Sequence, residues 1–323
     1  NLNNDIGLPL TLLNLSKDHQ WAVVELGMNR LGEIERLAEI CLPDIGLITN
    51  IGPAHLEGLG SMEAVTKAKG ELLGKIKPDG MAVLNADDPR LMKLAEVTPI
   101  NVLLFGMSKD AAIRAESVEE KGEGLSFSLV LPDETISVHL NTPAMFMISN
   151  ALAAAAAGHL LGLTAVEIKS GIEAFKPVQG RMNIHKTGKG IHIIDDTYNA
   201  NPGSMQAAIT TLTSLRGKKK GFLIVGDMLE LGEHSAPMHQ KIGAVAARSE
   251  IAGLYVTGTY AEDVTKGALE EHMNQVDILI GTHEEIIDAV TDRLNAGDWV
   301  LVKGSRGMTM EKVVRGLLAW ADS

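Results

Sequence analysis

The chain has 323 residues, of which 45% are hydrophobic and 3% aromatic, and its formal net charge is −12. This length exceeds one average core, so we expect two domains. The negative charge and the few aromatic residues argue against a nucleic-acid binder, and a polyanionic ligand would need a local basic pocket or metal ions. Cys41 is the single cysteine, which excludes an intramolecular disulfide and fits a reducing cytoplasm.

Short apolar runs alternate with helix-like segments along most of the chain. Expected strands cover 22–26, 45–49, 81–84, 101–105, 192–195, 222–225, 254–257, 277–280 and 299–302. Helical patterns cover 33–40, 61–76, 148–161, 208–215, 239–247, 284–294 and 310–320. This alternation predicts an α/β fold with parallel sheets covered by helices on both faces. The most apolar helical stretch, 151–163, is too short to span a bilayer, so we expect no membrane insertion.

One region departs from this alternation. Apolar and polar residues alternate over 125–129 and again over 136–140, with a Pro132-Asp133 turn between them. We interpret 112–140 as a small antiparallel sheet or hairpin appended to the first domain. Pro and Gly cluster over 175–181, where a helical pattern ends. This segment predicts a boundary that divides the chain into domains 1–180 and 181–323.

Polar side chains gather where the expected strand 192–195 ends. They are Asp195, Asp196, Tyr198, Asn199 and Asn201. Ligands of open α/β sheets bind at the carboxyl ends of strands, and an acid at such an end often binds ribose hydroxyls. An Asx-rich turn requires fewer polar groups than are present, so a binding site is the favoured interpretation. Ser204 is expected to cap the helix that follows.

A second group comprises Glu25, His55 and Lys69. Glu25 ends the expected strand 22–26 and His55 follows the end of 45–49, so a parallel sheet would place both at one edge. A carboxylate and a neutral imidazole can share a divalent cation. A solvated glutamate and a loop histidine would fit the same pattern. Lys69 would be repelled by a metal unless its charge were removed.

Three further loops carry candidate groups. In Gly180-Arg181 the glycine permits close backbone approach and the arginine forms a fork for phosphate oxygens, although a linker with a surface arginine is the favoured interpretation of this segment in isolation. The segment 302–307 offers two cations and two glycines between a strand and a helix, which suits an anionic group or a capping loop. The segment 226–232, followed by His234 and His239, is interpreted as a loop with two surface histidines. No P-loop and no dinucleotide-binding G-x-G-x-x-G pattern is present.

Taken together, these motifs resemble the Mur ligase family over essentially the whole chain. The matching segments are 3–10, 25–29, 50–56, 68–73, 85–89, 150–154, 180–182, 195–205, 226–232 and 303–306. The resemblance implies an incomplete P-loop-type central domain that binds ATP and carries a small antiparallel insert, followed by a Rossmann-like C-terminal ligase domain. The family's UDP-binding domain and P-loop precede the segment that matches Asn3. We therefore expect 1–323 to be an N-terminally truncated fragment without ligase activity of its own.

The pattern Asp-Asp-x-Tyr-Asn-Ala-Asn-Pro at 195–202 resembles the family branch that adds D-Ala-D-Ala. The resemblance implies that ATP phosphorylates the terminal carboxylate of UDP-N-acetylmuramoyl-tripeptide, and that the amine of D-Ala-D-Ala attacks the acyl phosphate to form an amide. It implies ATP and Mg²⁺ as cofactors. We expect a cytoplasmic monomer that binds these two substrates and no nucleic acid.

The resemblance also implies individual roles. Glu25, His55 and Lys69 would hold Mg²⁺, with Lys69 carbamylated by CO₂, and Lys69 and His55 would be catalytic. Asn150 would lie by the adenine of ATP, Arg181 by its phosphates and Asp196 by its ribose. The residues that would face the reacting peptide ends are Tyr198, Asn199, Asn201, Lys303, Ser305 and Arg306. Phe146 and Met147 replace a histidine and an asparagine of the family pattern before Asn150.

Three alternatives stay open. The first is another amide ligase of this superfamily, such as a neighbouring Mur ligase or folylpolyglutamate synthase; the Tyr198-Asn199-Ala200-Asn201 loop argues against it. The second is a non-catalytic nucleotide-binding protein, which predicts an unmodified Lys69 and no metal. The third is an oxidoreductase on doubly wound domains, which the missing G-x-G-x-x-G pattern disfavours.

Overall fold

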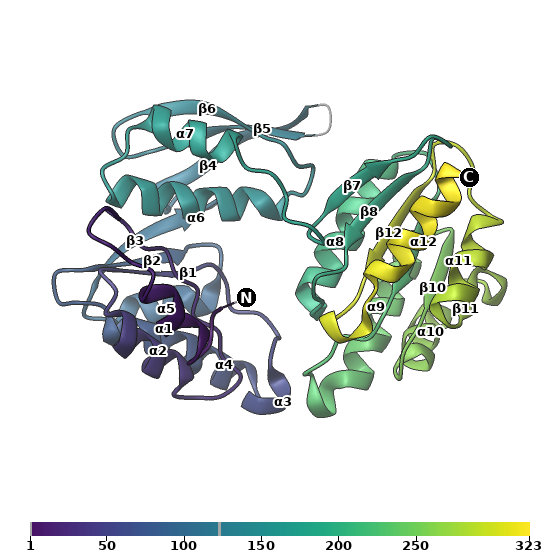
Figure 1. The fold of residues 1–323 in the computed structure, drawn as a ribbon, viewed down its shortest axis with the longest axis horizontal. Coiled ribbons are helices and arrows are strands. Elements are labelled where there is room, and N and C mark those ends of the chain that lie inside the picture. The colour runs from purple at the N-terminus through teal and green to yellow at the C-terminus, as the bar shows by residue number, and fades with distance from the viewer. Residues whose placement is uncertain (1, 122–123) are drawn as a thin grey trace. The chain divides into compact units, whose positions relative to one another are not determined.

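The computed structural model describes residues 2–121 and 124–323, which form two compact units (Figure 1). Unit 1 comprises Asn1–Asn141 and Met145–Phe175, and unit 2 comprises Thr142–Ala144 and Lys176–Ser323. Each unit contains a six-stranded sheet flanked by helices. The chain is therefore an α/β protein with two sheets, as the alternation of strand and helix patterns predicts.

The sheet of unit 1 has the strand order β1-β2-β3-β4-β5-β6. Its strands are β1 (Ile45–Ile48), β2 (Met81–Asn85), β3 (Asn101–Gly106), β4 (Ile113–Lys121), β5 (Gly124–Val130) and β6 (Thr135–Leu140). The helices are α1 (Gly7–Leu12), α2 (Glu33–Cys41), α3 (Leu56–Leu59), α4 (Met62–Gly70), α5 (Pro89–Val97), α6 (Phe146–Leu160) and α7 (Ala165–Glu173). A 3₁₀ turn, Glu71–Lys75, replaces the last turn of the expected helix 61–76.

One expectation for unit 1 needs correction, and another is confirmed. Residues 22–26 form no strand, and Val23 is 93% exposed. A strand needs a hydrogen-bonded neighbour, and the one backbone bond recorded close to this segment joins Gly27 N–H to the carbonyl of Asn3. The strands of 112–140 are antiparallel and belong to unit 1, as expected. β4 pairs in parallel with β3, so they continue the main sheet.

The sheet of unit 2 has the order β11-β10-β9-β12-β8-β7, parallel except for β7. Its strands are β7 (Asn183–Lys186), β8 (His192–Asp196), β9 (Gly221–Val225), β10 (Gly253–Val256), β11 (Ile278–Ile280) and β12 (Trp299–Lys303). The helices are α8 (Pro202–Arg216), α9 (Ser235–Arg248), α10 (Ala261–Glu270), α11 (His283–Thr291) and α12 (Glu311–Asp322). Short 3₁₀ turns occupy Gly232–His234, Gln275–Asp277 and Arg306–Met308.

The central strands of unit 2 are buried on both faces. Every residue of β9 and β12 is buried, which explains why these strands read as continuous apolar runs rather than alternating ones. Phe222 and Val300 pack with Val313 and Leu317 of α12, and α8 covers β12 and β9. This packing fixes the carboxyl ends of β8, β9 and β12 at one edge, from which the candidate loops leave.

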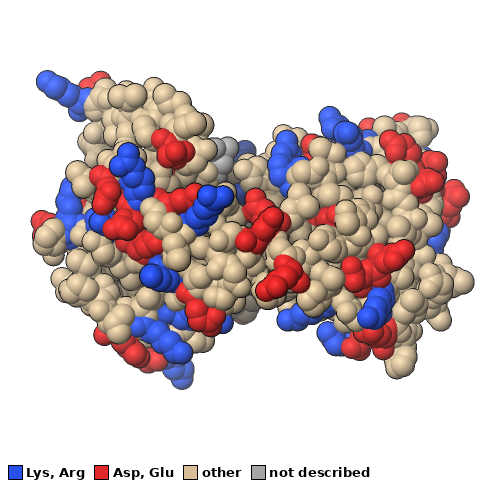
Figure 2. Space-filling model, turned by 90° about the horizontal axis from the view of Figure 1, so that it is seen from below, with Lys and Arg blue, Asp and Glu red and all other residues tan. Residues whose placement is uncertain are grey.

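The described residues contain no helix that is long and apolar enough to cross a membrane. The longest, α6 and α8, have 15 residues each, whereas a bilayer core requires about 20. On the face drawn in Figure 2, Lys and Arg side chains lie among Asp and Glu side chains rather than in one basic field. A polyanion would therefore meet mixed charge over that face.

Candidate functional site

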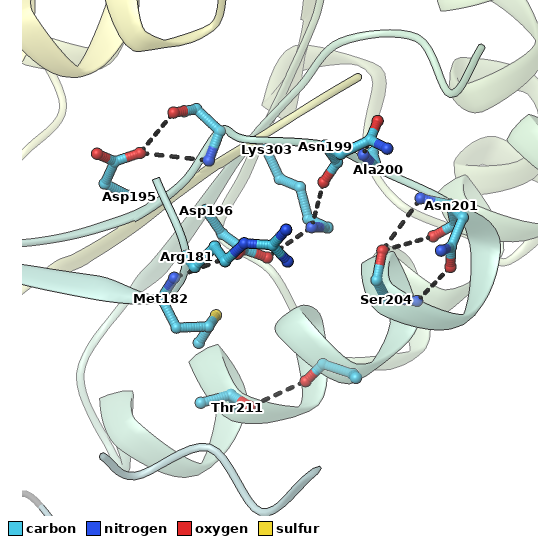
Figure 3. A network of polar contacts seen from close by, with 12 residues as sticks. Arg181, Met182, Asp195, Asp196, Asn199, Ala200, Asn201, Ser204, Thr211 and Lys303 are labelled. Carbon is cyan, nitrogen blue, oxygen red and sulfur yellow. Dashed lines mark hydrogen bonds and ion pairs between the residues drawn. The ribbon is translucent and has the colours of Figure 1, made fainter. Parts of the chain in front are cut away.

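The loop that leaves β8 is anchored by a buried ion pair. Lys303, the last residue of β12, lies in register with Asp196 of the neighbouring strand, and its Nζ is 2.6 Å from Asp196 Oδ2 (Figure 3). Nζ also donates to the carbonyl of Asn199 at 2.8 Å. Met182 N–H donates to the second oxygen, Asp196 Oδ1, at 3.2 Å. Burial lowers the pKa of Lys303, and the adjacent Asp196 opposes that shift.

Asp195 has a different environment from Asp196. Its Oδ1 accepts bonds from the backbone N–H of Thr197 at 3.2 Å and from the Thr197 hydroxyl at 2.6 Å. Both residues are buried. Asp195 therefore closes the turn that begins the loop, as Asx residues commonly do. Asp196, in contrast, is the acid that pairs with Lys303.

Arg181 lies over the aromatic ring of Tyr198, which belongs to the loop after β8. Its guanidinium carbon is 4.3 Å from the ring centroid of Tyr198, a cation–π distance. Gly180 makes this approach possible: its φ is +73°, its carbonyl accepts from Tyr198 N–H, and a Cβ here would lie 3.2 Å from that nitrogen. Arg181 is exposed, so its guanidinium is held in place yet accessible to an anion.

Asn201 caps the helix that follows the loop. Its Oδ1 accepts from Ser204 N–H at 2.8 Å, and Ser204 Oγ accepts from Asn201 N–H at 3.0 Å. Pro202 occupies the first helical position, where its missing N–H costs nothing. The expectation that Ser204 is the cap was wrong: Ser204 is the third helical residue of a capping box whose cap is Asn201. Asn199, in contrast, is exposed.

Replacing the cap should cost measurable stability. Asn201→Ala is expected to destabilise unit 2 by about 1 kcal/mol, because Ser204 N–H loses its acceptor, whereas Asn201→Asp should stay within about 0.5 kcal/mol. Urea unfolding followed by tryptophan fluorescence measures this in a Trp21→Phe background, which leaves both remaining tryptophans in unit 2. Equal stability of the Ala and Asp variants would show that the capping bond contributes nothing.

Ser305 is buried between two loops, and Arg306 is exposed. Ser305 Oγ donates to the carbonyl of Ala200 at 3.2 Å and accepts from Leu229 N–H at 2.8 Å. Arg306 lies 3.5 Å from Glu311 Oε1, a weak surface pair. The structure therefore brings Arg181, the 197–201 loop and the end of β12 together in unit 2.

His239 is buried rather than a surface residue, which corrects the interpretation of the segment after β9. It is 2% exposed and stacks on Tyr260. Its Nδ1 lies 2.7 Å from the carbonyl of Ser235, and its Nε2 lies 2.8 Å from Met228 N–H. A carbonyl only accepts and an N–H only donates, so the ring is neutral with its proton on Nδ1. His239 thereby holds the 226–231 loop. The only sequence signal for its burial was its position on the apolar face of a helix.

This burial makes the stability of unit 2 depend on pH. Burial lowers the pKa of His239, although the Ser235 carbonyl and the carboxylates of Asp227 and Asp263 oppose the shift. The unfolded chain therefore binds the proton first, and stability should fall as pH falls from about 6.5 toward the folded pKa. His239→Gln should flatten this slope between pH 5 and 7, and the half-exposed His283→Gln should not. Identical slopes in unfolding titrations of both variants and the parent would contradict this role.

Lys69 contacts the loop that follows β1. Its Nζ donates to the carbonyl of Asn50 at 2.7 Å. Burial lowers the pKa of Lys69, against the attraction of the Asp88 carboxylate. Asp88 Oδ2 accepts from Ile51 N–H, and its Oδ1 caps α5 ahead of Pro89. The role of Asp88 was not predicted, although an acid directly before a proline is a sequence signal for a helix start.

The other candidates of unit 1 are Glu25, His55 and Asn150. Glu25 is exposed and accepts from Asn3 Nδ2 at 3.0 Å. His55 has φ +57° at the start of α3, five residues after the carbonyl that Lys69 contacts. Asn150 is exposed on α6. Within the described ranges, no three His, Cys, Asp or Glu side chains converge as a ready-made metal site.

Comparison with known proteins identifies the class. The family model for the Mur ligase middle domain matches residues 1–158, and the model for the Mur ligase, glutamate ligase domain matches residues 180–306. The chain belongs to the Mur ligase family. A curated relative, the UDP-N-acetylmuramoyl-tripeptide–D-alanyl-D-alanine ligase of Escherichia coli (strain K12), is 36% identical over 321 residues, which cover 98% of this chain and 69% of the relative.

Solved structures agree with this assignment. A crystal structure of MurF from Acinetobacter baumannii superposes with a TM-score of 0.91 at 31% identity, covering 99% of this chain and 69% of that one. A MurF ligase from Thermotoga maritima in complex with ADP superposes with a TM-score of 0.87 at 30% identity, covering 99% and 72%. The expected pair of a middle domain and a C-terminal ligase domain is thereby confirmed.

Proposed function

We propose that this chain provides the ATP-binding and ligase portions of an enzyme that joins D-Ala-D-Ala to UDP-N-acetylmuramoyl-tripeptide in peptidoglycan precursor synthesis. The relatives that span 98% of the chain carry this activity in their names. The observation that carries the proposal is the 195–202 loop, which leaves the carboxyl end of β8 and is held by the buried Lys303 through the Asp196 carboxylate and the Asn199 carbonyl. Cytoplasmic location, a monomeric state and a domain boundary at Gly180 belong to the same proposal.

In the proposed reaction, the terminal carboxylate of the tripeptide takes the γ-phosphoryl group of ATP and ADP leaves. The amine of D-Ala-D-Ala then attacks the acyl carbon, an amide forms and inorganic phosphate departs. Arg181 would bind phosphate oxygens with a guanidinium already fixed against Tyr198. Asn150 would contact the adenine. Asp196 would accept ribose hydroxyls through lone pairs that Lys303 and Met182 leave available.

Carbamylation of Lys69 would give Glu25, His55 and Lys69 the donor chemistry that a magnesium ion prefers. Burial lowers the pKa of Lys69, so more of its amine is neutral and able to add CO₂ with release of a proton. The carbamate would supply the oxygen ligand that Glu25 and His55 lack, and it would remove the positive charge that repels a cation. Magnesium held there would neutralise charge on the transferring phosphoryl group.

The peptide ends would meet the loops of unit 2. Tyr198, Asn199, Asn201 and Arg306 would contact them with amide, phenol and guanidinium groups, and family resemblance places Lys303 and Ser305 in the same group. Of these six residues, Asn199 and Arg306 are exposed, whereas Lys303 and Ser305 are buried. The exposed pair is accessible to a peptide, whereas the donors of Lys303 and Ser305 are already bonded to loop carbonyls.

Oxygen tracing tests the proposed reaction. The natural protein that contains residues 1–323 would be supplied with ATP, D-Ala-D-Ala and tripeptide substrate labelled with ¹⁸O in its terminal carboxylate. We expect one labelled oxygen to appear in the released phosphate, because the acyl phosphate transfers it there, and release should require D-Ala-D-Ala. Unlabelled phosphate, or phosphate release without the dipeptide, would contradict the acyl-phosphate route.

A further inference from the structure

The end of β12 holds two consecutive carbonyl groups of the 197–201 loop. Lys303 Nζ donates to the carbonyl of Asn199 at 2.8 Å, and Ser305 Oγ donates to the carbonyl of Ala200 at 3.2 Å. Residues two apart in an extended chain project to the same side, and Ser305 has extended backbone angles. Alternate side chains of one strand end thus reach successive carbonyls of the loop.

Both side chains have little capacity left for a substrate. Lys303 is 2% exposed and Ser305 is 3% exposed. A serine hydroxyl has one proton, and that of Ser305 is directed at Ala200. Its oxygen accepts from Leu229 N–H, and its backbone N–H donates to the carbonyl of Asp227. Ser305 therefore ties the 197–201 loop to the 226–231 loop.

We propose that Lys303 and Ser305 are positioning residues that fix the backbone of the 197–201 loop, and that they do not touch the peptide substrates. Tyr198 and Asn199 are then the side chains that this fixed backbone presents. The inference rests on the proposed ligase function and departs from the substrate contact that family resemblance implies for Lys303 and Ser305. On this inference, the buried pair holds the loop in position, and the accessible side chains recognise the peptide substrate.

Ser305→Ala tests the inference with two readouts. The first is hydrogen exchange of the amides of Tyr198 and Ala200, whose acceptors are Gly180 and Asn199. We expect both amides to exchange about tenfold faster in Ser305→Ala. Because neither hydrogen bond includes Ser305, faster exchange would report that the loop has loosened. The second is steady-state kinetics in the natural protein that contains residues 1–323. KM for a peptide substrate should rise about tenfold, and KM for ATP should change less than twofold.

Lys303 and Ser305 together form a clamp on the backbone of the 197–201 loop, and a second variant removes the contact that Lys303 makes. Lys303→Met combined with Asp196→Asn deletes the bond to Asn199 without leaving a lone buried charge, and should produce the same exchange pattern. Lys218→Met, at an exposed site on the same unit, should change neither readout.

The two readouts separate the possible failures. Unchanged exchange in both clamp variants would overturn the inference, as would a tenfold kinetic loss in Ser305→Ala without faster exchange, since that pattern indicates direct substrate contact. If the parent enzyme does not ligate, the proposed function fails, and the exchange data alone still decide whether the clamp holds the loop.

Discussion

Lys69→Met should lower the rate of amide formation at least about 1,000-fold, whereas Lys67→Met should ligate like the parent enzyme. Lys67 lies on the same helix, α4, two residues earlier, and is exposed. Methionine cannot form a carbamate, so Glu25 and His55 would lack the third ligand of the proposed magnesium site. The matched control removes one lysine charge from the helix without touching the Asn50 loop.

Rates and a direct chemical readout together test this expectation. Ligation would be measured in the natural protein that contains residues 1–323. A carbamate carbon should appear in the ¹³C spectrum of the parent and Lys67→Met proteins equilibrated with ¹³C-bicarbonate, and it should be absent from Lys69→Met. Parental rates in Lys69→Met, or no carbamate signal in a fully active parent enzyme, would remove the carbamylated lysine from the mechanism.

Lys303→Met should destabilise unit 2 by about 3–5 kcal/mol. The substitution leaves Asp196 as a buried charge whose remaining recorded partner is Met182 N–H. Removing one member of a buried ion pair costs far more than losing an exposed pair, because the remaining charge is neither solvated nor compensated. The carbonyl of Asn199 loses its donor in the same variant.

A double substitution separates the charge effect from the loss of packing. Lys303→Met with Asp196→Asn should recover at least about half of the loss, since no buried charge remains. Lys218→Met should stay within about 0.5 kcal/mol of the parent. Urea unfolding in the Trp21→Phe background gives all three values. A single Lys303→Met variant as stable as Lys218→Met would show that the ion pair does not stabilise unit 2.

Much of the fold follows from local patterns. The parallel strands are apolar runs separated by helical periodicity, so β8, β9 and β12 were found close to their actual bounds. β7 was not predicted, because Asn183–Lys186 offers a single apolar residue and depends on antiparallel pairing with β8. The segment 22–26 has a strand-like composition but forms no strand, since composition does not supply a hydrogen-bonded neighbour.

The candidate site was predictable as a location but not as a set of contacts. The polar residues after β8 could be identified from their place at a strand end. Lys303 pairs with Asp196 because β12 and β8 are in register, although the two residues are 107 positions apart in the sequence. No local sequence pattern encodes this pairing. The buried state of His239 and the division of labour between Asp195 and Asp196 likewise depend on tertiary packing.

The choice of amine tests the proposed function most directly. The natural protein that contains residues 1–323 would be given ATP, UDP-N-acetylmuramoyl-tripeptide and an equimolar mixture of D-Ala-D-Ala, D-Ala, D-Glu and L-Lys, and its products would be identified by mass spectrometry. We expect the D-Ala-D-Ala adduct to account for nearly all product and to disappear without ATP. A product that carries a single amino acid, or no ATP-dependent product, would contradict the assignment of this chain to D-Ala-D-Ala ligation.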